Sequence, residues 1–443
     1  MSDAMNSTAA FSRRHFLRQG ARLAAAGVAA PYFIPSGVLA ADGRPGANDR
    51  IGIGFIGIGR QASDLLKLML NRPEARFVAV ADVNLKRAQS AAAKNNGVAF
   101  QDYRRLLERK DVDAIITATP EHWRALICIA ACQAGKDIYG EKPMTLTIRE
   151  GRLMVEAVRK YQRVFQTGSQ QRSMWANHVG CELVRNGAIG KIKRVIAYNY
   201  PTSWECALPA EPIPEGLDWD MWCGPTEVAP YNKDLYLPRA NPGWLSFRPY
   251  SGGEMTGWGA HGFDQVQCAL GMDESGPIEV WTEGPKFNPP KYTAAEPQAR
   301  GDKLGSEPKV FFRYPGDTVM ELANGPMGGA IFIGEKGKIT IDRAICRSDP
   351  PGLAEAALDK RQNGFTENHL KNWLDFIKSR QKPIADVEIG HRSATVCHLG
   401  NIARWTGRKL RWDPVKELFP DDAGANQYLD RQRRQPWELP KTV

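Results

Sequence analysis

The 443-residue sequence has no uninterrupted apolar run of the ~20 residues that a membrane-spanning helix requires. Its Lys and Arg residues form no basic run interleaved with aromatic residues, although the net charge is +10, so nucleic-acid binding has little support. Its eight cysteines match no zinc-binding spacing, and we expect no metal site. The composition, 42% hydrophobic and 24% charged, is that of a globular chain long enough for more than one domain.

The first forty residues have the pattern of an export signal. Residues 12–17 read Ser-Arg-Arg-His-Phe-Leu, and a stretch that is apolar except for Arg22, residues 21–30, follows before Pro31 and Pro35. A twin arginine ahead of a weakly apolar stretch that ends in small residues at Ala40 resembles a twin-arginine signal peptide. We therefore expect cleavage after Ala40, export of the folded chain by the twin-arginine machinery to the periplasm, and no stable membrane anchor.

A dinucleotide fingerprint follows this segment. An apolar run over residues 50–57 is typical of a buried parallel strand, and a helical pattern follows from residue 62. Between them, Gly57, Gly59 and Ala62 match Gly-x-Gly-x-x-Gly/Ala. Gly57 permits the tight turn, Gly59 lets the backbone approach a pyrophosphate, and Ala62 lets the helix pack closely on the strand. The N–H groups and dipole at the helix N-terminus then favour the phosphates.

An acidic residue stands where such a site needs one. A second apolar strand, residues 77–81, ends at Asp82. A carboxylate there accepts hydrogen bonds from ribose hydroxyls and repels a 2′-phosphate, which favours NAD over NADP. Lys86 and Arg87 follow closely in the sequence and leave NADP open.

Strand and helix patterns continue to alternate beyond this point. Residues 113–119 and 138–139 read as further buried strands, with a helical pattern between them. This alternation predicts a parallel, doubly wound sheet over residues 48–170. Ligands bind beyond the carboxyl ends of such strands, where Thr-Pro-Glu-His at 119–122 and Glu-Lys-Pro at 141–143 fall.

These motifs together resemble the glucose–fructose oxidoreductase / inositol dehydrogenase family, in its subgroup with twin-arginine signals and a long C-terminal tail. The motifs that carry the resemblance lie at 57–59, 81–84, 119–123, 140–143, 252–254 and 258–261. The resemblance implies a second, α+β domain at 171–413 on a large, open, mostly antiparallel sheet, with subunits paired into homodimers or homotetramers. Residues 414–443 read as an arm that docks on its own or a neighbouring subunit.

The resemblance also implies a cofactor pocket and a catalytic group. Besides the fingerprint and Asp82, it assigns the pocket to Thr119, Pro120, His122, Glu141 and Lys142. Lys142 is the first candidate for the base that takes the substrate's hydroxyl proton, with Glu141 beside it and Pro143 in a cis bond.

His261 is the second catalytic candidate. Relatives carry an Asp-x-x-x-His motif here, but this chain has Gly257 at the Asp position. Asp264, three residues after His261, shares its helical face, and we expect it to orient the imidazole. A structural histidine is the alternative interpretation.

The segment from Trp204 to Phe247 is rich in aromatic residues, from which we take Trp222 and Tyr236 as substrate contacts, with loop packing as the alternative. Arg172 is a candidate for a substrate anion, unless it forms an ion pair. The leading hypothesis is an exported NAD(P)-dependent oxidoreductase of a sugar or sugar-like polyol, with a tightly bound cofactor that is recycled in place. The alternatives are an NAD-dependent glycosidase or lyase that oxidises its sugar transiently, and an idle binding or scaffold protein on the same fold.

Overall fold

The computed structural model describes residues 46, 49–237, 243–289, 291–293, 307–360 and 365–443. The expected signal peptide, residues 1–40, lies outside this part of the chain. None of the helices in the described part has the length and apolar character to cross a bilayer. The described residues also contain no cluster of three or more His, Cys, Asp or Glu side chains arranged to hold a metal ion.

The N-terminal domain is built on a parallel sheet. Its described strands are β1 (Ile51–Ile56), β2 (Ala75–Ala81), β3 (Val98–Phe100), β4 (Ala114–Thr117), β5 (Asp137–Gly140) and β6 (Phe165–Thr167). Their order is β3-β2-β1-β4-β5-β6, with every pair parallel. The chain reverses direction across the sheet between β1 and β4, and dinucleotides bind beyond strand ends at such a point.

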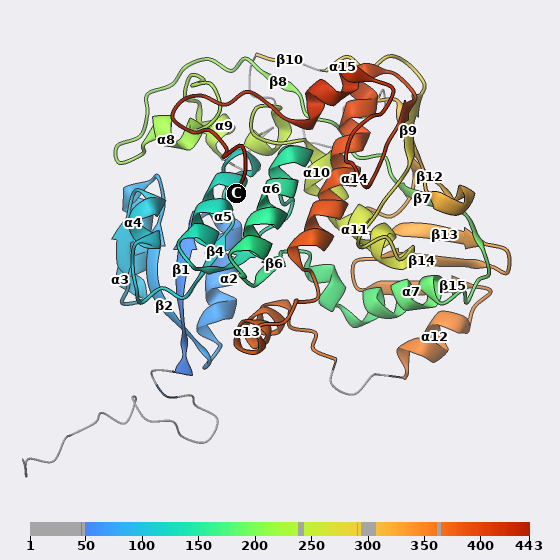
Figure 1. Ribbon diagram of the computed structural model, residues 1–443, viewed down its shortest axis with the longest axis horizontal. Helices are drawn as coiled ribbons and strands as arrows, with labels where there is room; N and C mark the ends of the chain where they lie inside the picture. The colour runs from blue at the N-terminus through green and yellow to red at the C-terminus, as the bar shows by residue number, and fades with distance from the viewer. Residues whose placement is uncertain (1–45, 47–48, 238–242, 290, 294–306, 361–364) are drawn as a thin grey trace, which may run out of the picture. The chain divides into compact units, whose positions relative to one another are not determined.

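Helices cover both faces of this sheet (Figure 1). One layer contains α2 (Arg60–Leu70) and α3 (Leu85–Lys94), together with α13 (His369–Ser379) from late in the sequence. The other contains α4 (Tyr103–Leu107), α5 (Glu121–Gln133) and α6 (Ile148–Lys160). Buried apolar strand residues pack between the layers, which explains why the strands read as continuous apolar runs.

The second domain has a larger, mixed sheet. Its described strands run in the order β15-β14-β13-β7-β12-β11-β9-β16, and all neighbours are antiparallel except β7 and β12. The strands are β7 (Ile192–Tyr198), β9 (Glu279–Glu283), β11 (Lys309–Arg313), β12 (Val319–Ala323), β13 (Ala330–Gly334), β14 (Lys338–Asp342), β15 (Ile345–Asp349) and β16 (Leu410–Arg411). The predicted fold class, a doubly wound Rossmann domain followed by an α+β domain with a mostly antiparallel sheet, is confirmed.

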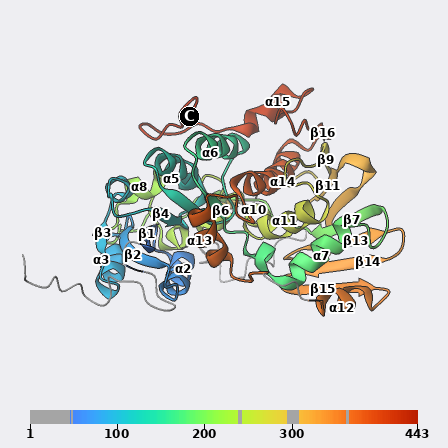
Figure 2. The same cartoon turned by 60° about the horizontal axis from the view of Figure 1, so that its bottom comes forward.

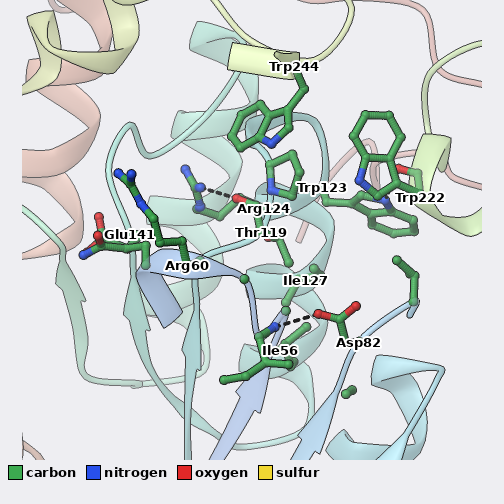
Figure 3. A pocket seen from close by; sticks show the side chains of 18 of the residues that line it. Ile56, Arg60, Asp82, Thr119, Trp123, Arg124, Ile127, Glu141, Trp222 and Trp244 are labelled. Carbon is green, nitrogen blue, oxygen red and sulfur yellow. Dashed lines mark hydrogen bonds between the residues drawn. The ribbon is translucent and has the colours of Figure 1, made fainter. Parts of the chain in front are cut away.

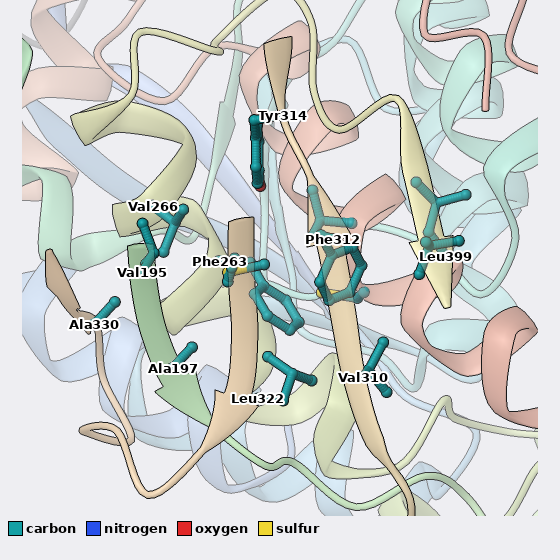
Figure 4. Close-up of a cluster of buried hydrophobic side chains, with 14 of the residues drawn as sticks. Val195, Ala197, Phe263, Val266, Val310, Phe312, Tyr314, Leu322, Ala330 and Leu399 are labelled. Carbon is teal, nitrogen blue, oxygen red and sulfur yellow. The ribbon is translucent and has the colours of Figure 1, made fainter. Parts of the chain in front are cut away.

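One face of this sheet carries the core of the second domain (Figure 4). Buried side chains alternate with exposed or partly exposed ones in β11, in β12 and in β7 from Val195 onward, so each strand turns one face to the helices. The buried face packs against α7 (Trp175–Arg185), α11 (Gly259–Ala269) and α14 (Val387–Thr406). Phe263 of α11 and Phe312 of β11 meet there, with ring centroids 5.7 Å apart.

A separate cluster of aromatic side chains, here called the aromatic module, is formed by residues between β7 and α10 (Glu254–Gly257) together with one later strand. It contains α8 (Trp219–Cys223), α9 (Lys233–Tyr236) and the short parallel pair β8 (Glu205–Cys206) and β10 (Lys291–Tyr292). Its buried members are Trp204, Leu208, Leu217, Trp219, Trp222, Cys223, Tyr231, Leu235, Phe247, Tyr250 and Tyr292. The module packs against the first domain, because Leu85 N donates to Gly216 O and Asp218 N donates to Val83 O.

Candidate functional site

A cavity of about 700 Å³ opens beyond the carboxyl ends of β1, β2, β4 and β5. Its walls include the fingerprint turn, Asp82, the residues after β4, Glu141 and Lys142, and side chains of the aromatic module. Figure 3 shows Asp82 at one end, Arg60 and Glu141 at another, and Trp222 and Trp244 across from them. The predicted cofactor residues Gly57, Gly59, Asp82, Thr119, Pro120, Glu141 and Lys142 all line this one cavity.

The turn between β1 and α2 requires glycine at Gly57. Its φ is +76°, and a Cβ there would lie 2.8 Å from Thr119 Cγ2. Gly59 caps α2 and faces open space, since an added Cβ would meet nothing within 4 Å. Helix α2 has no side-chain cap and no acidic residue in its first turn, while Ala62 is fully buried against the sheet. An uncapped N-terminus facing a cavity is suited to bind phosphate.

Asp82 is fixed at the end of β2. One carboxylate oxygen accepts a hydrogen bond from Ile58 N at 2.8 Å, and the other accepts one from Asn84 N at 2.8 Å. Arg87 Nη1 lies 3.6 Å from Asp82 Oδ2. The carboxylate is therefore oriented by backbone N–H groups at the place where a ribose would bind.

Trp222 and Tyr236 line the cavity, but near Asp82 rather than near Lys142. The Arg87 guanidinium lies 5.3 Å from the centre of the Tyr236 ring, which in turn lies 6.1 Å from the Trp222 ring. The structure thus places Tyr236 on the side of the cavity where Arg87 and Asp82 lie, and the role of Trp222 and Tyr236 as substrate contacts stays a prediction. The aromatic count alone could not show this, because the position depends on how the module folds back onto β2.

Glu141 lies buried at the opposite end. Its Oε1 accepts hydrogen bonds from Gln61 Nε2 at 3.0 Å and Gln170 Nε2 at 2.6 Å, and its Oε2 accepts one from Lys142 N at 3.0 Å. Burial raises the pKa of Glu141, while Lys142 and Arg124 oppose that shift. Glu141 thus ties the first turn of α2 to the segment that carries Lys142.

Lys142 follows β5 and reaches the second domain. Its Nζ donates to Gly257 O of α10 at 3.2 Å. The Lys142–Pro143 peptide bond is cis, as expected from the Glu-Lys-Pro motif. The buried Arg124 guanidinium donates to Pro143 O and Thr119 O, which joins the two strand-end motifs.

Arg172 is not a substrate residue, which corrects the prediction. Its Nε donates to both carboxylate oxygens of Asp264 at 2.9 Å, and its Nη2 donates to Asp273 at 2.7 Å. Burial would lower the pKa of Arg172, but the Asp264 carboxylate holds it well above the ordinary value. The ion pair named as the alternative is therefore what the structure contains.

Asp264 does not orient His261 in the way that their spacing indicated. Its carboxylate accepts hydrogen bonds from Arg172 and, at 2.8 Å, from Ser393 Oγ. His261 lies near the start of α11, buried, with its ring 5.7 Å from that of Trp258. It follows Gly257, the residue that binds Lys142, by one helical turn, and its role in proton transfer stays a prediction.

His122 also differs from the prediction. It lies one residue inside α5 and is buried beneath the aromatic module, where its Nε2 is 2.9 Å from Trp222 O. Burial lowers its pKa to about 3, so the imidazole is neutral. It supports the wall of the cavity rather than lining the cofactor pocket.

Glu121 is a buried residue next to the site that the sequence did not single out. This fully buried carboxylate accepts hydrogen bonds from Ser251 Oγ at 2.6 Å, Gly252 N at 3.2 Å and Thr256 Oγ1 at 3.1 Å. Burial raises its pKa to about 7. It therefore joins the first turn of α5 to α10, where Gly257 binds Lys142. A glutamate directly after a strand-end Thr-Pro was the available signal.

The C-terminal arm, residues 414–443, docks on its own chain near the cavity, where both views place the C-terminus beside α5 and α6 (Figure 2). Arg431 and Arg433 both donate to Glu150 Oε1 of α6 at 3.0 Å. Arg434 Nε donates to Gly224 O at 3.1 Å. The Trp437 ring lies 4.8 Å from that of Trp123, which lines the cavity.

The geometry fits a dinucleotide. The uncapped N-terminus of α2, the open space at Gly59 and the fixed carboxylate of Asp82 correspond to the pyrophosphate and ribose positions of the nucleotide. Glu141 lies away from Asp82 in this cavity (Figure 3), and Lys142, the candidate base, lines the same cavity.

Comparison with known protein families agrees with a dinucleotide-binding domain followed by a second domain. A model described as the oxidoreductase family, NAD-binding Rossmann fold, matches residues 51–169. A model described as the oxidoreductase family, C-terminal alpha/beta domain, matches residues 181–439.

The chain is also similar to curated proteins over part of its length. It is 30% identical over 154 residues to inositol 2-dehydrogenase of Salmonella typhimurium, an alignment that covers 34% of this chain and 46% of the relative. It is 26% identical over 155 residues to 2,7-anhydro-N-acetylneuraminate hydratase of Mediterraneibacter gnavus, covering 35% and 40%. It is 25% identical over 217 residues to a glycosyl hydrolase family 109 protein of Shewanella pealeana, covering 44% and 47%. The chain thus spans less than half the length of each relative.

Solved structures share the fold. WlbA dehydrogenase from Bordetella pertussis, in complex with NADH and UDP-GlcNAcA, aligns with a TM-score of 0.59 at 16% identity, covering 83% of this chain and 99% of that chain. Levoglucosan dehydrogenase, in complex with NADH and levoglucosan, aligns with a TM-score of 0.56 at 18% identity, covering 82% and 99%. With both family models matched in order along the sequence, the chain belongs to the oxidoreductase family that joins an NAD-binding Rossmann domain to a C-terminal α/β domain.

Proposed function

We propose that this protein is an exported oxidoreductase that acts on a sugar or sugar-like polyol with a tightly held NAD or NADP recycled in its site. The observation that carries the proposal is Lys142, because it lines the same cavity as the fingerprint turn and Asp82. The names of the similar proteins, an inositol dehydrogenase and a levoglucosan dehydrogenase among them, support a polyol substrate.

Oxidation of a carbinol removes a hydride from carbon and a proton from oxygen. The chemistry that NAD supplies when bound is acceptance of that hydride. Lys142 Nζ, in its neutral form, takes the hydroxyl proton, and its hydrogen bond to Gly257 O fixes the position of the amine. Glu141, anchored by Gln61 and Gln170, holds the backbone N–H of Lys142 in place.

Export is the reason we propose that the cofactor is reduced and reoxidised without leaving the site. The twin arginine at 13–14 supports passage of the folded chain to the periplasm, where little free NAD is available to exchange. A retained cofactor then requires a second carbonyl compound, to which the hydride returns. The aromatic module, which lines the cavity and is anchored by the C-terminal arm, supports slow release of the dinucleotide.

The experiment is to purify the chain without added cofactor, denature it and identify any nicotinamide dinucleotide in the supernatant by mass. A near-stoichiometric yield is expected and names NAD or NADP. Lys142→Ala should keep the same dinucleotide content while losing hydride transfer from sugars. A chain that is empty and binds no dinucleotide more tightly than millimolar would overturn the proposal in favour of a scaffold protein.

A second candidate is a glycosidase or lyase that oxidises its sugar transiently and returns the hydride to the same molecule. The names of two relatives, a hydratase and a family 109 glycosyl hydrolase, favour it, as does the absence of an acid at Gly257. This reaction would release product with no net change in absorbance at 340 nm. Incorporation of solvent deuterium next to the oxidised carbon would distinguish it from net oxidation.

A further inference from the structure

The first turn of α5 holds the segment whose carbonyl binds the candidate base. The fully buried Glu121 carboxylate accepts hydrogen bonds from Ser251 Oγ at 2.6 Å and from Gly252 N at 3.2 Å. Its two oxygens also lie 3.3 and 3.1 Å from Thr256 Oγ1. Thr256 directly precedes Gly257, whose carbonyl oxygen accepts the hydrogen bond from the amine of the candidate base at 3.2 Å. The contacts of Glu121 therefore fix the segment that carries this acceptor.

The same turn of α5 also holds the backbone next to the candidate base. Arg124 follows Glu121 by three residues, so the two side chains share a helical face, and Arg124 is likewise buried. The Arg124 guanidinium donates through Nη1 to Pro143 O and through Nη2 to Thr119 O (Figure 3). Pro143 directly follows Lys142. This contact therefore fixes the peptide segment from which the Lys142 side chain extends.

Two buried ionisable side chains in one helical turn are costly to the fold. Burial raises the pKa of Glu121 to about 7 and lowers the pKa of Arg124, and the charge of each opposes the shift of the other. Apolar residues of similar size often give equal or greater stability in place of such a buried pair. The contacts of Glu121 and Arg124, all of them made with residues beside the site, point to a role in its geometry.

We propose that Glu121 and Arg124 are positioning residues for Lys142, an inference that rests on the proposed function. Glu121 fixes the Gly257 carbonyl that accepts the hydrogen bond from Lys142. Arg124 fixes the backbone from which the Lys142 amine is presented. Because both side chains belong to one turn of α5, the amine and its acceptor are held in register although they belong to different domains. A general base must lie within hydrogen-bond reach of the proton that it takes, so a small displacement of the amine slows the reaction.

The test is competitive labelling of lysine amines with acetic anhydride, in the full-length protein saturated with NADH and read by mass spectrometry. It measures the reactivity of Lys142 relative to the exposed Lys110 across pH, and it needs no substrate. Glu121→Ala and Arg124→Lys should each raise the relative reactivity of Lys142 about threefold to tenfold, the scale of one lost hydrogen bond. Lysine at position 124 keeps the charge, but it lacks the rigid fork that reaches two carbonyls.

Two further variants separate positioning from stability. Glu121→Gln keeps the size of the side chain and an acceptor oxygen for Ser251 Oγ, so the reactivity of Lys142 should stay at the wild-type level. Asp137→Ala is the matched control, because this buried carboxylate pairs with Arg380 in the same domain but lies at the start of β5, the end away from Lys142. It should lower the melting temperature and leave the reactivity of Lys142 unchanged.

Unchanged reactivity of Lys142 in Glu121→Ala or in Arg124→Lys would overturn the proposal. An increase of the same size in Glu121→Gln or in Asp137→Ala would overturn it as well, because general destabilisation would then explain the result. Hydride transfer from neutral hexoses and cyclitols to bound NAD is measured on the same preparations. Its absence in wild type would contradict the proposed function, whereas the labelling would still decide whether Glu121 and Arg124 position the amine.

Discussion

Arg434→Ala is expected to increase the rate of cofactor release, although Arg434 does not line the cavity. The Arg434 side chain donates to the carbonyls of Asp220, Gly224 and Thr226 and to the Asp220 carboxylate, all in or next to α8, whose Trp222 lines the cavity. The ion pair with Asp220 adds little, because Asp220 is 65% exposed. The three hydrogen bonds to carbonyls contribute roughly 0.5–1.5 kcal/mol each. Water replaces part of these bonds in the variant, so the net loss of stabilisation is about 2 kcal/mol.

If this energy holds the aromatic module closed, its loss raises the rate of cofactor release about 30-fold, since each 1.4 kcal/mol is about tenfold. The assay is release of bound NADH, followed by its fluorescence after mixing with excess NAD. Arg411→Ala is the matched control, because Arg411 pairs with Asp421 on the surface, where their side chains are 63% and 68% exposed. Release from Arg434→Ala at the wild-type rate would refute the argument that the arm retains the cofactor.

Three further outcomes follow from the buried charges. Asp82→Ser should weaken NADH binding and shift preference toward NADPH, because the negative charge is removed while Arg87 remains nearby; titration with both dinucleotides measures this, and unchanged preference would contradict it. Arg172→Met should lower the free energy of unfolding by about 3–5 kcal/mol, since it leaves the buried Asp264 carboxylate without its cationic partner; urea unfolding measures this, and a loss of substrate affinity with unchanged stability would restore the substrate role. Burial raises the pKa of Glu121 from 4.5 to about 7. Between these pH values the folded protein keeps a proton that the unfolded chain has lost. The contribution of Glu121 to the free energy of unfolding is therefore full below pH 4.5 and is lost as the pH rises to about 7. Glu121→Gln should abolish this component, which unfolding at pH 5 and pH 8 detects; an unchanged pH dependence would argue against a protonated Glu121.

The first domain was the more predictable from sequence because its signals are local. The fingerprint turn and Asp82 depend on backbone geometry within one β–α unit, and the structure places both on the cavity. The strands β3 and β6 were missed, since each has three residues and neither shows a long apolar run.

The site residues were less predictable where their roles depend on distant partners. Arg172 and Asp264 are 92 residues apart, so no spacing rule could reveal that they pair. Asp264 and His261 share a helical face as expected, yet the carboxylate is turned to the arginine and to Ser393. Glu121 acts on residues about 130 positions later, and its buried network depends on how the two domains meet.

The most direct test of the central claim is single-turnover hydride transfer at 340 nm, with wild type and Lys142→Ala matched for bound NAD and mixed with neutral hexoses and cyclitols. If Lys142 takes the hydroxyl proton, wild type shows a stoichiometric rise in absorbance with at least one polyol. The variant should retain its cofactor and react about 10²–10⁴ times more slowly, the usual contribution of a general base. Equal rates in the two proteins would contradict Lys142 as the base, and no hydride transfer in wild type would contradict the oxidoreductase itself.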